Sequence, residues 1–522
     1  MPSLSRTAVL SNYELLTLIF GDFLPWDPTR LARDEVVQGR KQLRDLAITC
    51  KAFKDPALAK LWTYLDSLLP LALVLPDLRV WNNGYPTTQK PVSISPHAYV
   101  LIAKLLEGQA LFPGLRKVVL QTECDPATEL AILPLIFPPS VETAEIHGEG
   151  FSKPMFANYC LPFLMTQFKC TLKHLSLKND KQDVDPAVVD AIVQLTCLES
   201  LDLQLPQSNR IKPEYLMEIG KAFQKLTSLK LDVHFPSHRV SETSPHQNHD
   251  LDTSGLFPAL KSLHVVSRSE SQICACIPAY LVEKITSLVL MLTEPIQTTD
   301  FFASTMISLS KMRSLKKLEV FGGSTTRVAH WNAMLPLLQQ LPLEEFKLDV
   351  FQSTSWTASL ESLVDGAVTF RGQTSKNTTA IQPLQALTLP SSLKNSFITL
   401  DCLSTLAEEA IGLEYLAISL KPEGRSSGRK AIADLLFAWK TLKRSSCPLK
   451  RLAVSQFGSD VVFSAQEYDD LAQLLDLMFP QLTSIRPYDG EKTQPYWNKH
   501  WWFIERLRKM YKRCRLNQLP SH

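Results

Sequence analysis

A short apolar motif recurs thirteen times along this chain and limits the folds that it can adopt. The motif has apolar residues at its first, fourth and sixth positions, as in LRKVVL (115–120), LESLDL (198–203) and LKKLEV (315–320). Because apolar and variable residues alternate with the period of a β-strand, each copy predicts a short strand with one buried face. The other copies begin at residues 141, 172, 226, 260, 285, 343, 384, 413, 449 and 482.

The segments between the copies carry apolar residues at the spacing of an α-helix. Examples are PAVVDAIVQL (186–195), PEYLMEIGKAF (213–223) and AQEYDDLAQLLDLMF (465–479). Each unit is therefore predicted to be a helix, a turn and a strand, and a single unit cannot cover its own apolar face. Stacked units bury a continuous core, so the pattern predicts an α/β solenoid.

The motif and its spacing of about thirty residues resemble leucine-rich repeats, with about 13 repeats over residues 111–490. The Asn or Cys that this family usually places after the last leucine is mostly missing, and the repeat lengths are irregular. The resemblance implies a curved parallel sheet on the concave side and helices on the convex side. It also implies that the array is a binding surface.

The variable positions of the strands are expected to face the concave side, where a substrate could bind. Charges of both signs alternate at these positions, which favours a protein or peptide over a phosphate-rich ligand. The candidate substrate-binding residues are Lys178, Asp202, Lys230, Asp232, Glu319, Phe321, Lys347 and Arg451.

Three short apolar segments near the N-terminus predict a separate helical module. YELLTLIFGDFL (13–24) is apolar almost all the way round, and LRDLAITC (43–50) and PALAKLWTYL (56–65) can cover one flank. Asp55 is expected to be the N-cap of the third helix, with Pro56 at its first position. A unit this small does not normally stabilise itself, so its remaining apolar flank needs a partner.

The combination of ELLTLIFGDFL, LRDLAITCKAF and a helix that ends in LW resembles an F-box, in the style of fungal F-box proteins. The resemblance implies that residues 8–75 dock onto the Skp adaptor of a Skp–cullin–F-box ubiquitin ligase. The repeats would then capture an unknown protein substrate. The adaptor-facing residues that it implies are Leu10, Leu15, Ile19, Phe20, Leu24, Leu46, Cys50, Lys51, Leu58, Leu61 and Trp62.

On this interpretation the chain is a non-catalytic receptor, monomeric by itself, that needs no cofactor and reaches a cullin scaffold through the adaptor. Two features depart from the F-box pattern: Leu10-Ser11-Asn12-Tyr13 replaces the usual Leu-Pro opening, and a long charged segment (25–42) separates the first two helices. The alternative is that the helices only cap the solenoid, which leaves a stand-alone protein-binding scaffold. Residues 76–110 are assigned to a linker and the N-terminal cap of the solenoid.

The C-terminal segment, residues 491–522, is predicted to cap the last repeat with a helix. Aromatic residues interleaved with basic ones also occur in proteins that bind nucleic acid or membranes, but a cap is what a solenoid requires. We therefore expect neither nucleic acid nor a membrane as a partner. The apolar stripe of this helix is expected to be Trp497, Trp501, Ile504, Leu507, Tyr511 and Cys514.

Composition and motifs argue against several other classes of function. Lys and Arg number 55 against 52 Asp and Glu, so the net charge of +3 gives no bulk attraction for nucleic acid. No apolar signal segment opens the chain and the ten cysteines lack framework spacing, which predicts reduced thiols in the cytoplasm and/or nucleus. No catalytic motif is present, so we do not expect an enzyme.

Two segments contain residues that could bind a metal, but neither has the ligand spacing of a known site. Cys274 and Cys276 lack a second pair of cysteines nearby. Four histidines lie within residues 234–249, and this segment is predicted to be a solvated loop. We predict no metal. The long segments 234–255 and 369–381 interrupt the regular spacing of the repeats, and they are either functional or disordered.

Overall fold

In a computed structural model the chain divides into two compact units, Met1–Ala259 and Leu260–His522. The described residues are 12–21, 23, 33–61, 115–121, 138–148, 158, 161–179, 186–206, 214–233, 255–267, 281, 284–292, 309, 312–322, 341–350, 384–389, 398–421, 430–441, 443–455, 463–488 and 500–518.

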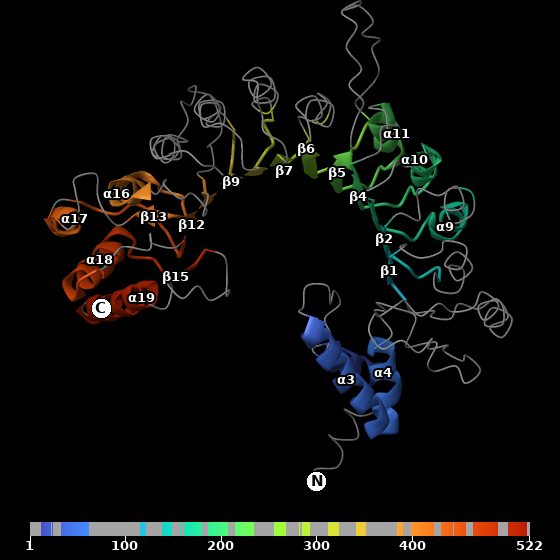
Figure 1. Ribbon diagram of the computed structural model, residues 1–522, viewed down its shortest axis with the longest axis horizontal. Coiled ribbons are helices and arrows are strands. Elements are labelled where there is room, and N and C mark those ends of the chain that lie inside the picture. Colours follow the sequence, from blue (N-terminus) through green and yellow to red (C-terminus); the bar gives the residue numbers. More distant parts are fainter. Residues whose placement is uncertain are drawn as a thin grey trace, which may run out of the picture. The chain divides into compact units, whose positions relative to one another are not determined.

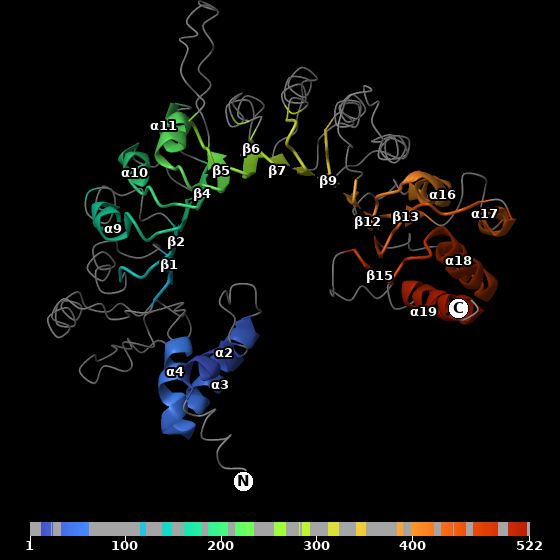
Figure 2. The same ribbon diagram turned by 180° about the vertical axis from the view of Figure 1, so that it is seen from behind.

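The N-terminal helices are α2 (Tyr13–Gly21), α3 (Arg33–Thr49) and α4 (Lys51–Leu61), which gather into one module in Figure 2. The Asn12 side chain accepts a hydrogen bond from the Leu15 amide at 3.0 Å. An N-cap of this kind satisfies a free amide of the first turn, so Asn12 starts the helix in place of the Leu-Pro opening. The module is held by an apolar core of Leu16, Phe20, Leu43 and Ala57.

Two helix boundaries in this module differ from the sequence prediction. Helix α3 begins at Arg33, so the second half of the charged segment is helical, and Val36 packs against the core. Helix α4 begins at Lys51 with Pro56 inside it, so the prediction of Asp55 as an N-cap was wrong. An interior proline costs about 3 kcal/mol. The helical turn before it places Phe53 edge-on against Phe20 at 5.5 Å, and a pair of this kind offsets part of the cost.

The described residues of unit 1 also form five parallel strands, each hydrogen-bonded to the next in chain order. Buried and half-buried residues alternate along them, and the buried Leu175 and Leu177 line one small apolar cavity with Leu161 and Phe168 of a neighbouring helix. The helices therefore cover one face of the strands (Figure 1). The elements are β1 (Lys117–Gln121), β2 (Thr143–His147), β3 (His174–Lys178), β4 (Ser200–Leu205), β5 (Ser228–Val233), α9 (Leu161–Phe168), α10 (Pro186–Ile192) and α11 (Glu214–Ala222).

Unit 2 continues the same arrangement with eight parallel strands that pair in chain order. They are β6 (Ser262–Ser267), β7 (Ser287–Leu292), β8 (Lys317–Gly322), β9 (Glu345–Val350), β10 (Ala386–Thr388), β12 (Tyr415–Ile418), β14 (Arg451–Val454) and β15 (Ser484–Pro487). Two short strands, β11 (Ile398–Thr399) and β13 (Leu420–Lys421), form a separate parallel pair. The described helices are α16 (Leu400–Glu409), α17 (Lys430–Thr441), α18 (Ala465–Met478) and α19 (Trp502–Gln518).

Each of the thirteen motif copies contains one of these thirteen strands, and the three helices quoted above correspond to α10, α11 and α18. The motif leucines are buried because they face the helices, as Leu198, Leu201 and Leu203 show. The predicted α/β leucine-rich repeat solenoid is therefore confirmed. The pair β11–β13 was not predicted, since strands of two residues leave no periodic pattern. Residues 234–254 and 369–381 lie outside the described part of the chain.

Replacing Gly220 of α11 with alanine is expected to destabilise unit 1. The new Cβ would lie 2.6 Å from the ring of Phe257, which is fully buried and donates its backbone N–H to the Gly220 carbonyl at 3.0 Å. Overpacking of this kind costs about 1–3 kcal/mol, which outweighs the gain in helix propensity of about 1 kcal/mol. Urea denaturation should show a lower free energy of unfolding. Gly255→Ala, which meets nothing within 4 Å, is the control, and equal stability of both variants would contradict the packing described.

Exposed and buried cysteines of the described part are expected to react with a maleimide at different rates. Cys170 and Cys514 are exposed, whereas Cys402 and Cys447 are buried. Burial raises the pKa of the Cys447 thiol to about 12, so almost no reactive thiolate forms near neutral pH. Mass spectrometry after brief labelling should therefore find Cys447 modified only in denaturant. Rapid labelling of Cys447 in the native chain would contradict its place in the core.

Candidate protein-binding surfaces

The strand residues that alternate with the buried leucines form the open strand face, which is the side of each sheet opposite the helices. In unit 1 the strand register aligns Glu145, Ser176, Asp202 and Lys230 in one row across four strands. Asp202 accepts hydrogen bonds from Gln204 at 2.9 Å and Ser176 at 3.4 Å, and pairs with Lys230 at 3.6 Å. Asp202 and Lys230 of this row therefore neutralise each other, whereas Glu145 pairs with Lys117 of β1 at 3.0 Å.

The candidate substrate-binding residues of unit 1 lie in two rows of this face and differ in exposure. Asp202 and Lys230 contact each other, as described, and Lys178 is half-buried in the next row, in register with Gln204. Asp232 belongs to the same row but is only 6% exposed. A ligand on this face would meet Lys178 and Lys230 before it met Asp232.

Unit 2 brings together a second set of the candidates. Lys317 lies 2.9 Å from Glu319 and 3.2 Å from Glu345 of the adjacent strand. The hydrogen bond to Glu319 is the main cause that raises the pKa of the Lys317 ammonium, with a further contribution from Glu345. This small network holds the Glu319 carboxylate in place, so it is available to a partner only in competition with Lys317.

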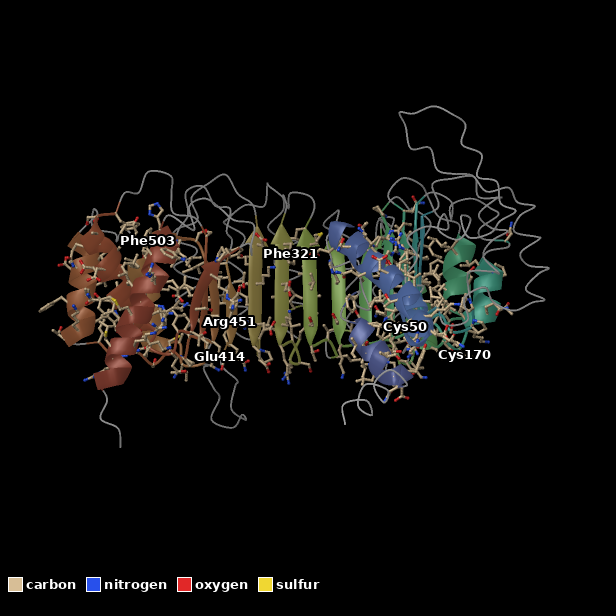
Figure 3. All side chains as sticks on the ribbon, turned by 90° about the horizontal axis from the view of Figure 1, so that it is seen from below. Cys50, Cys170, Phe321, Glu414, Arg451 and Phe503 are labelled. Atoms are coloured by element: carbon tan, nitrogen blue, oxygen red, sulfur yellow. The ribbon has the colours of Figure 1, made fainter. Side chains whose placement is uncertain are left out.

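Two cation–aromatic contacts occupy the open strand face of unit 2. The Lys347 ammonium lies 4.7 Å from the centre of the Phe321 ring, and the Arg451 guanidinium lies 5.2 Å from that of Tyr415. Figure 3 shows Phe321 and Arg451 near opposite ends of their strands. Of the predicted residues in unit 2, Phe321 and Lys347 contact each other directly, and the attraction of the ammonium to the ring face stabilises the pair.

Sequence reasoning missed the apolar neighbours of Phe321. Met291 is its register partner on β7 and is exposed, and Val266 on β6 is the register partner of Met291. Val289 lies in the next row, opposite Glu319. These four residues form an apolar patch, Val266, Val289, Met291 and Phe321. The sequence contained one signal for this patch, because Val289 is an apolar residue at a variable position of its motif copy.

The outer face of the N-terminal module is a second surface of unusual composition. Six of the twelve large apolar side chains that are exposed among the described residues belong to α2 and α3. Val37 and Ile48 are eleven residues apart, which places them on the same side of α3. The module's apolar face is used here as a collective name for these six exposed residues of α2 and α3: Tyr13, Leu15, Leu18, Ile19, Val37 and Ile48.

The adaptor-facing candidates divide between this face and the core of the module. Leu15 and Ile19 are exposed and belong to the module's apolar face. Phe20 is 3% exposed and packs between Phe23 and Phe53, so its side chain supports the core. Leu46 and Leu61 are partly buried against the same core, Cys50 and Leu58 are half-buried, and Lys51 is exposed. Leu10, Leu24 and Trp62 lie outside the described residues.

Helix α19 packs on α18 through polar as well as apolar contacts. Trp501 and Ile504 of the predicted stripe are buried, whereas Cys514 is exposed. Arg508, which was not predicted to belong to the stripe, is fully buried. Trp497 lies outside the described residues. Arg508 donates two hydrogen bonds to Glu505, at 2.8 and 3.0 Å, and one to the Leu482 carbonyl at 2.9 Å.

Two further cations of α19 bond the C-terminal end of α18 and the turn after it. Lys512 donates to the Leu482 carbonyl at 2.9 Å, and Arg515 donates to the Asp476 carbonyl at 3.1 Å and pairs with its carboxylate. Cations at this end of a helix satisfy carbonyls that lack partners. Burial raises the pKa of Asp476, and Arg515, Arg508 and Lys512 partly offset that rise.

Among the described residues, no three His, Cys, Asp or Glu side chains gather as metal ligands would. The candidates Cys274, Cys276 and the histidines of 234–249 lie outside those residues. No helix in the described part is long and apolar enough to cross a bilayer.

Comparison with known proteins gives structural likenesses alone. The sequence matches no protein-family model, and no curated protein matches it. The leucine-rich repeat protein LegL7 from Legionella pneumophila is 13% identical, with a TM-score of 0.31, over 75% of this chain and 95% of that chain. An internalin from Listeria monocytogenes is 12% identical, with a TM-score of 0.29, over 63% and 89%.

A chain from the crystal structure of the Rad7 and Elc1 complex in yeast is 16% identical, with a TM-score of 0.32, over 88% of this chain and 92% of that chain. No partner or activity of this chain follows from these likenesses.

Proposed function

We propose that this leucine-rich repeat protein is a substrate receptor of a Skp–cullin–F-box ubiquitin ligase. In this role the N-terminal module binds the Skp adaptor, and the repeats bind a protein substrate. The receptor itself performs no chemistry, and its contribution is to hold the substrate close to the conjugating enzyme.

The observation that carries the proposal is the module's apolar face. The core residues Leu16, Phe20 and Leu43 are already covered within the module, so Leu15, Leu18 and Ile19 are not needed to hold it together. Exposing apolar surface to water costs about 25 cal/mol per Å². A cluster of such residues on a small helical unit is therefore typical of a docking surface.

The open strand face of unit 2 supports the second half of the proposal. The apolar patch around Phe321 offers an anchor point, and Glu319 and Lys347 beside it offer one charge of each sign. A protein segment with an apolar side chain between charged ones would match this arrangement. A polyanion would meet the carboxylates of Glu319, Glu345 and Asp349 on the same strands.

Assembly of the purified components tests this function. The full chain, a Skp adaptor and a cullin should elute together from a size-exclusion column as one complex. The chain and the cullin should elute separately when the adaptor is omitted, because the adaptor joins them. A chain that binds neither component would contradict the proposal and leave residues 10–75 as a structural cap.

A further inference from the structure

Helix α19 carries more exposed apolar surface than its packing on α18 requires. Its inner side already supplies the buried Trp501, Ile504 and Arg508. On its outer side Trp502, Phe503 and Met510 remain 45%, 48% and 49% exposed. Three of the twelve exposed large apolar side chains in the described residues thus lie on one helix. The contacts with α18 do not explain them.

The two aromatic side chains of this group pack against neighbouring side chains. The Trp502 and Phe503 rings meet edge to face at 5.0 Å, and Phe503 also lies 6.3 Å from Tyr468 of α18. The Arg506 guanidinium lies 5.3 Å from the centre of the Trp502 ring. An aromatic–arginine group that is ordered before binding loses little entropy when a partner arrives.

The charges on this outer side have one sign. Arg506, Lys509 and Arg513 are exposed at helical spacing beside the three apolar side chains. Glu505 is the single acidic residue of α19, and its largely buried carboxylate pairs with Arg508 and, at 3.2 Å, with Lys509. The helix therefore presents Trp502, Phe503, Arg506, Lys509, Met510 and Arg513, here called the aromatic–basic face, on which Glu505 partly neutralises Lys509.

We infer that the aromatic–basic face of α19 binds an acidic, amphipathic protein segment. Carboxylates of such a segment would pair with Arg506 and Arg513, and its apolar side chains would cover Trp502, Phe503 and Met510. Arginine and aromatic side chains are enriched at the centres of protein interfaces, which favours a protein over other anions. This inference does not rest on adaptor docking, because it uses residues of α19 and none of the N-terminal module.

Nucleic acid and an anionic membrane fit the face less well. Three cations on one helix would neutralise few phosphates, and affinity for nucleic acid grows with the number neutralised. Membrane-surface helices separate an apolar face from a basic one, whereas here both kinds of side chain share one side. An acidic segment with interspersed apolar residues matches the mixture directly.

Selection from a phage library of random linear peptides tests the inference with the full chain as the target. Phage that also bind the Arg506→Glu variant are removed before each round. Enriched peptides are expected to combine Asp or Glu with aromatic or leucine residues. Enrichment of basic or uncharged peptides, or no enrichment over the starting library, would overturn the inference.

The most enriched peptide is then synthesised, and its affinity is measured by fluorescence anisotropy. Arg506→Glu is expected to weaken binding about tenfold or more. Phe437→Ser, which changes an exposed aromatic residue of α17, should leave the affinity unchanged. Equal binding to the native chain and Arg506→Glu, or equal loss in both variants, would place the site elsewhere. Binding to phosphatidylserine vesicles or single-stranded DNA that Arg506→Glu abolishes, without peptide binding, would assign the face to those anions instead.

Discussion

Replacing Arg508 with alanine is expected to destabilise unit 2 by about 3–5 kcal/mol, the usual cost of removing one partner of a buried ion pair. The Arg508 side chain is fully buried, and it makes three hydrogen bonds at 2.8 to 3.0 Å. Without it, the Glu505 carboxylate loses its bidentate partner and retains the pair with Lys509 at 3.2 Å, and the Leu482 carbonyl loses one of two side-chain hydrogen bonds. Urea denaturation monitored by tryptophan fluorescence measures the loss.

Arg513→Ala is the matched control, because this arginine lies on the same helix but is exposed. Its free energy of unfolding should change by no more than about 0.5 kcal/mol, which is usual for surface substitutions. Equal effects of the two substitutions would contradict the buried ion pair and, with it, the packing of α19 on α18.

The loss in Arg508→Ala should also be smaller in acid than at neutral pH. Burial raises the pKa of Asp476 in the folded chain, and Arg508 is one of the cations that oppose this rise. A carboxyl whose pKa is raised on folding favours the folded state at low pH, and that stability is lost as the pH rises through the folded pKa. Removing Arg508 enlarges this effect, so protonation of Asp476 should restore part of the stability.

Ile19→Asp is expected to weaken binding of the Skp adaptor about 100-fold, which corresponds to roughly 2.7 kcal/mol. Ile19 is exposed on α2, so a carboxylate there stays solvated in the free chain and the module keeps its core. In the complex the same carboxylate would be buried against apolar groups without a partner, which is costly. Isothermal titration of the purified adaptor into the full chain measures the change.

The control is Ile411→Asp, the same substitution at another exposed isoleucine, in unit 2. Its affinity for the adaptor should equal that of the native chain, and both variants should unfold at the native midpoint. An Ile19→Asp chain that binds the adaptor as tightly as the native chain would remove the module's apolar face from the interface.

The repeats could be predicted from the sequence because each strand buries alternate residues, and burial of this kind leaves a visible period. Leu201 and Leu203 are buried as the motif LESLDL requires, and Asp202 between them lies on the open strand face. The helical boundaries of the module were less predictable. The start of α3 depends on Val36, whose contact with the core brings a charged segment into the helix.

The candidate sites could be predicted only in part, because charged and aromatic side chains take their place from tertiary partners. Arg508 reads as a surface residue, and its burial depends on Glu505 and on a carbonyl 26 residues earlier in the chain. Helix α2 is apolar almost all the way round. The sequence alone therefore does not show that Phe20 is buried in the module and that Ile19 is exposed. The pairing of Lys347 with Phe321 depends on the register of β8 and β9.

The proposed function requires that a Skp adaptor docks on the N-terminal module. Hydrogen–deuterium exchange of the full chain, with and without a saturating concentration of the adaptor, tests it most directly. The adaptor is predicted to slow exchange in peptides from α2 and α3 and to leave peptides from β6 to β9 unchanged. Unchanged exchange in the module, or protection confined to the repeats, would contradict the claim and leave a repeat protein whose terminal helices serve only its own stability.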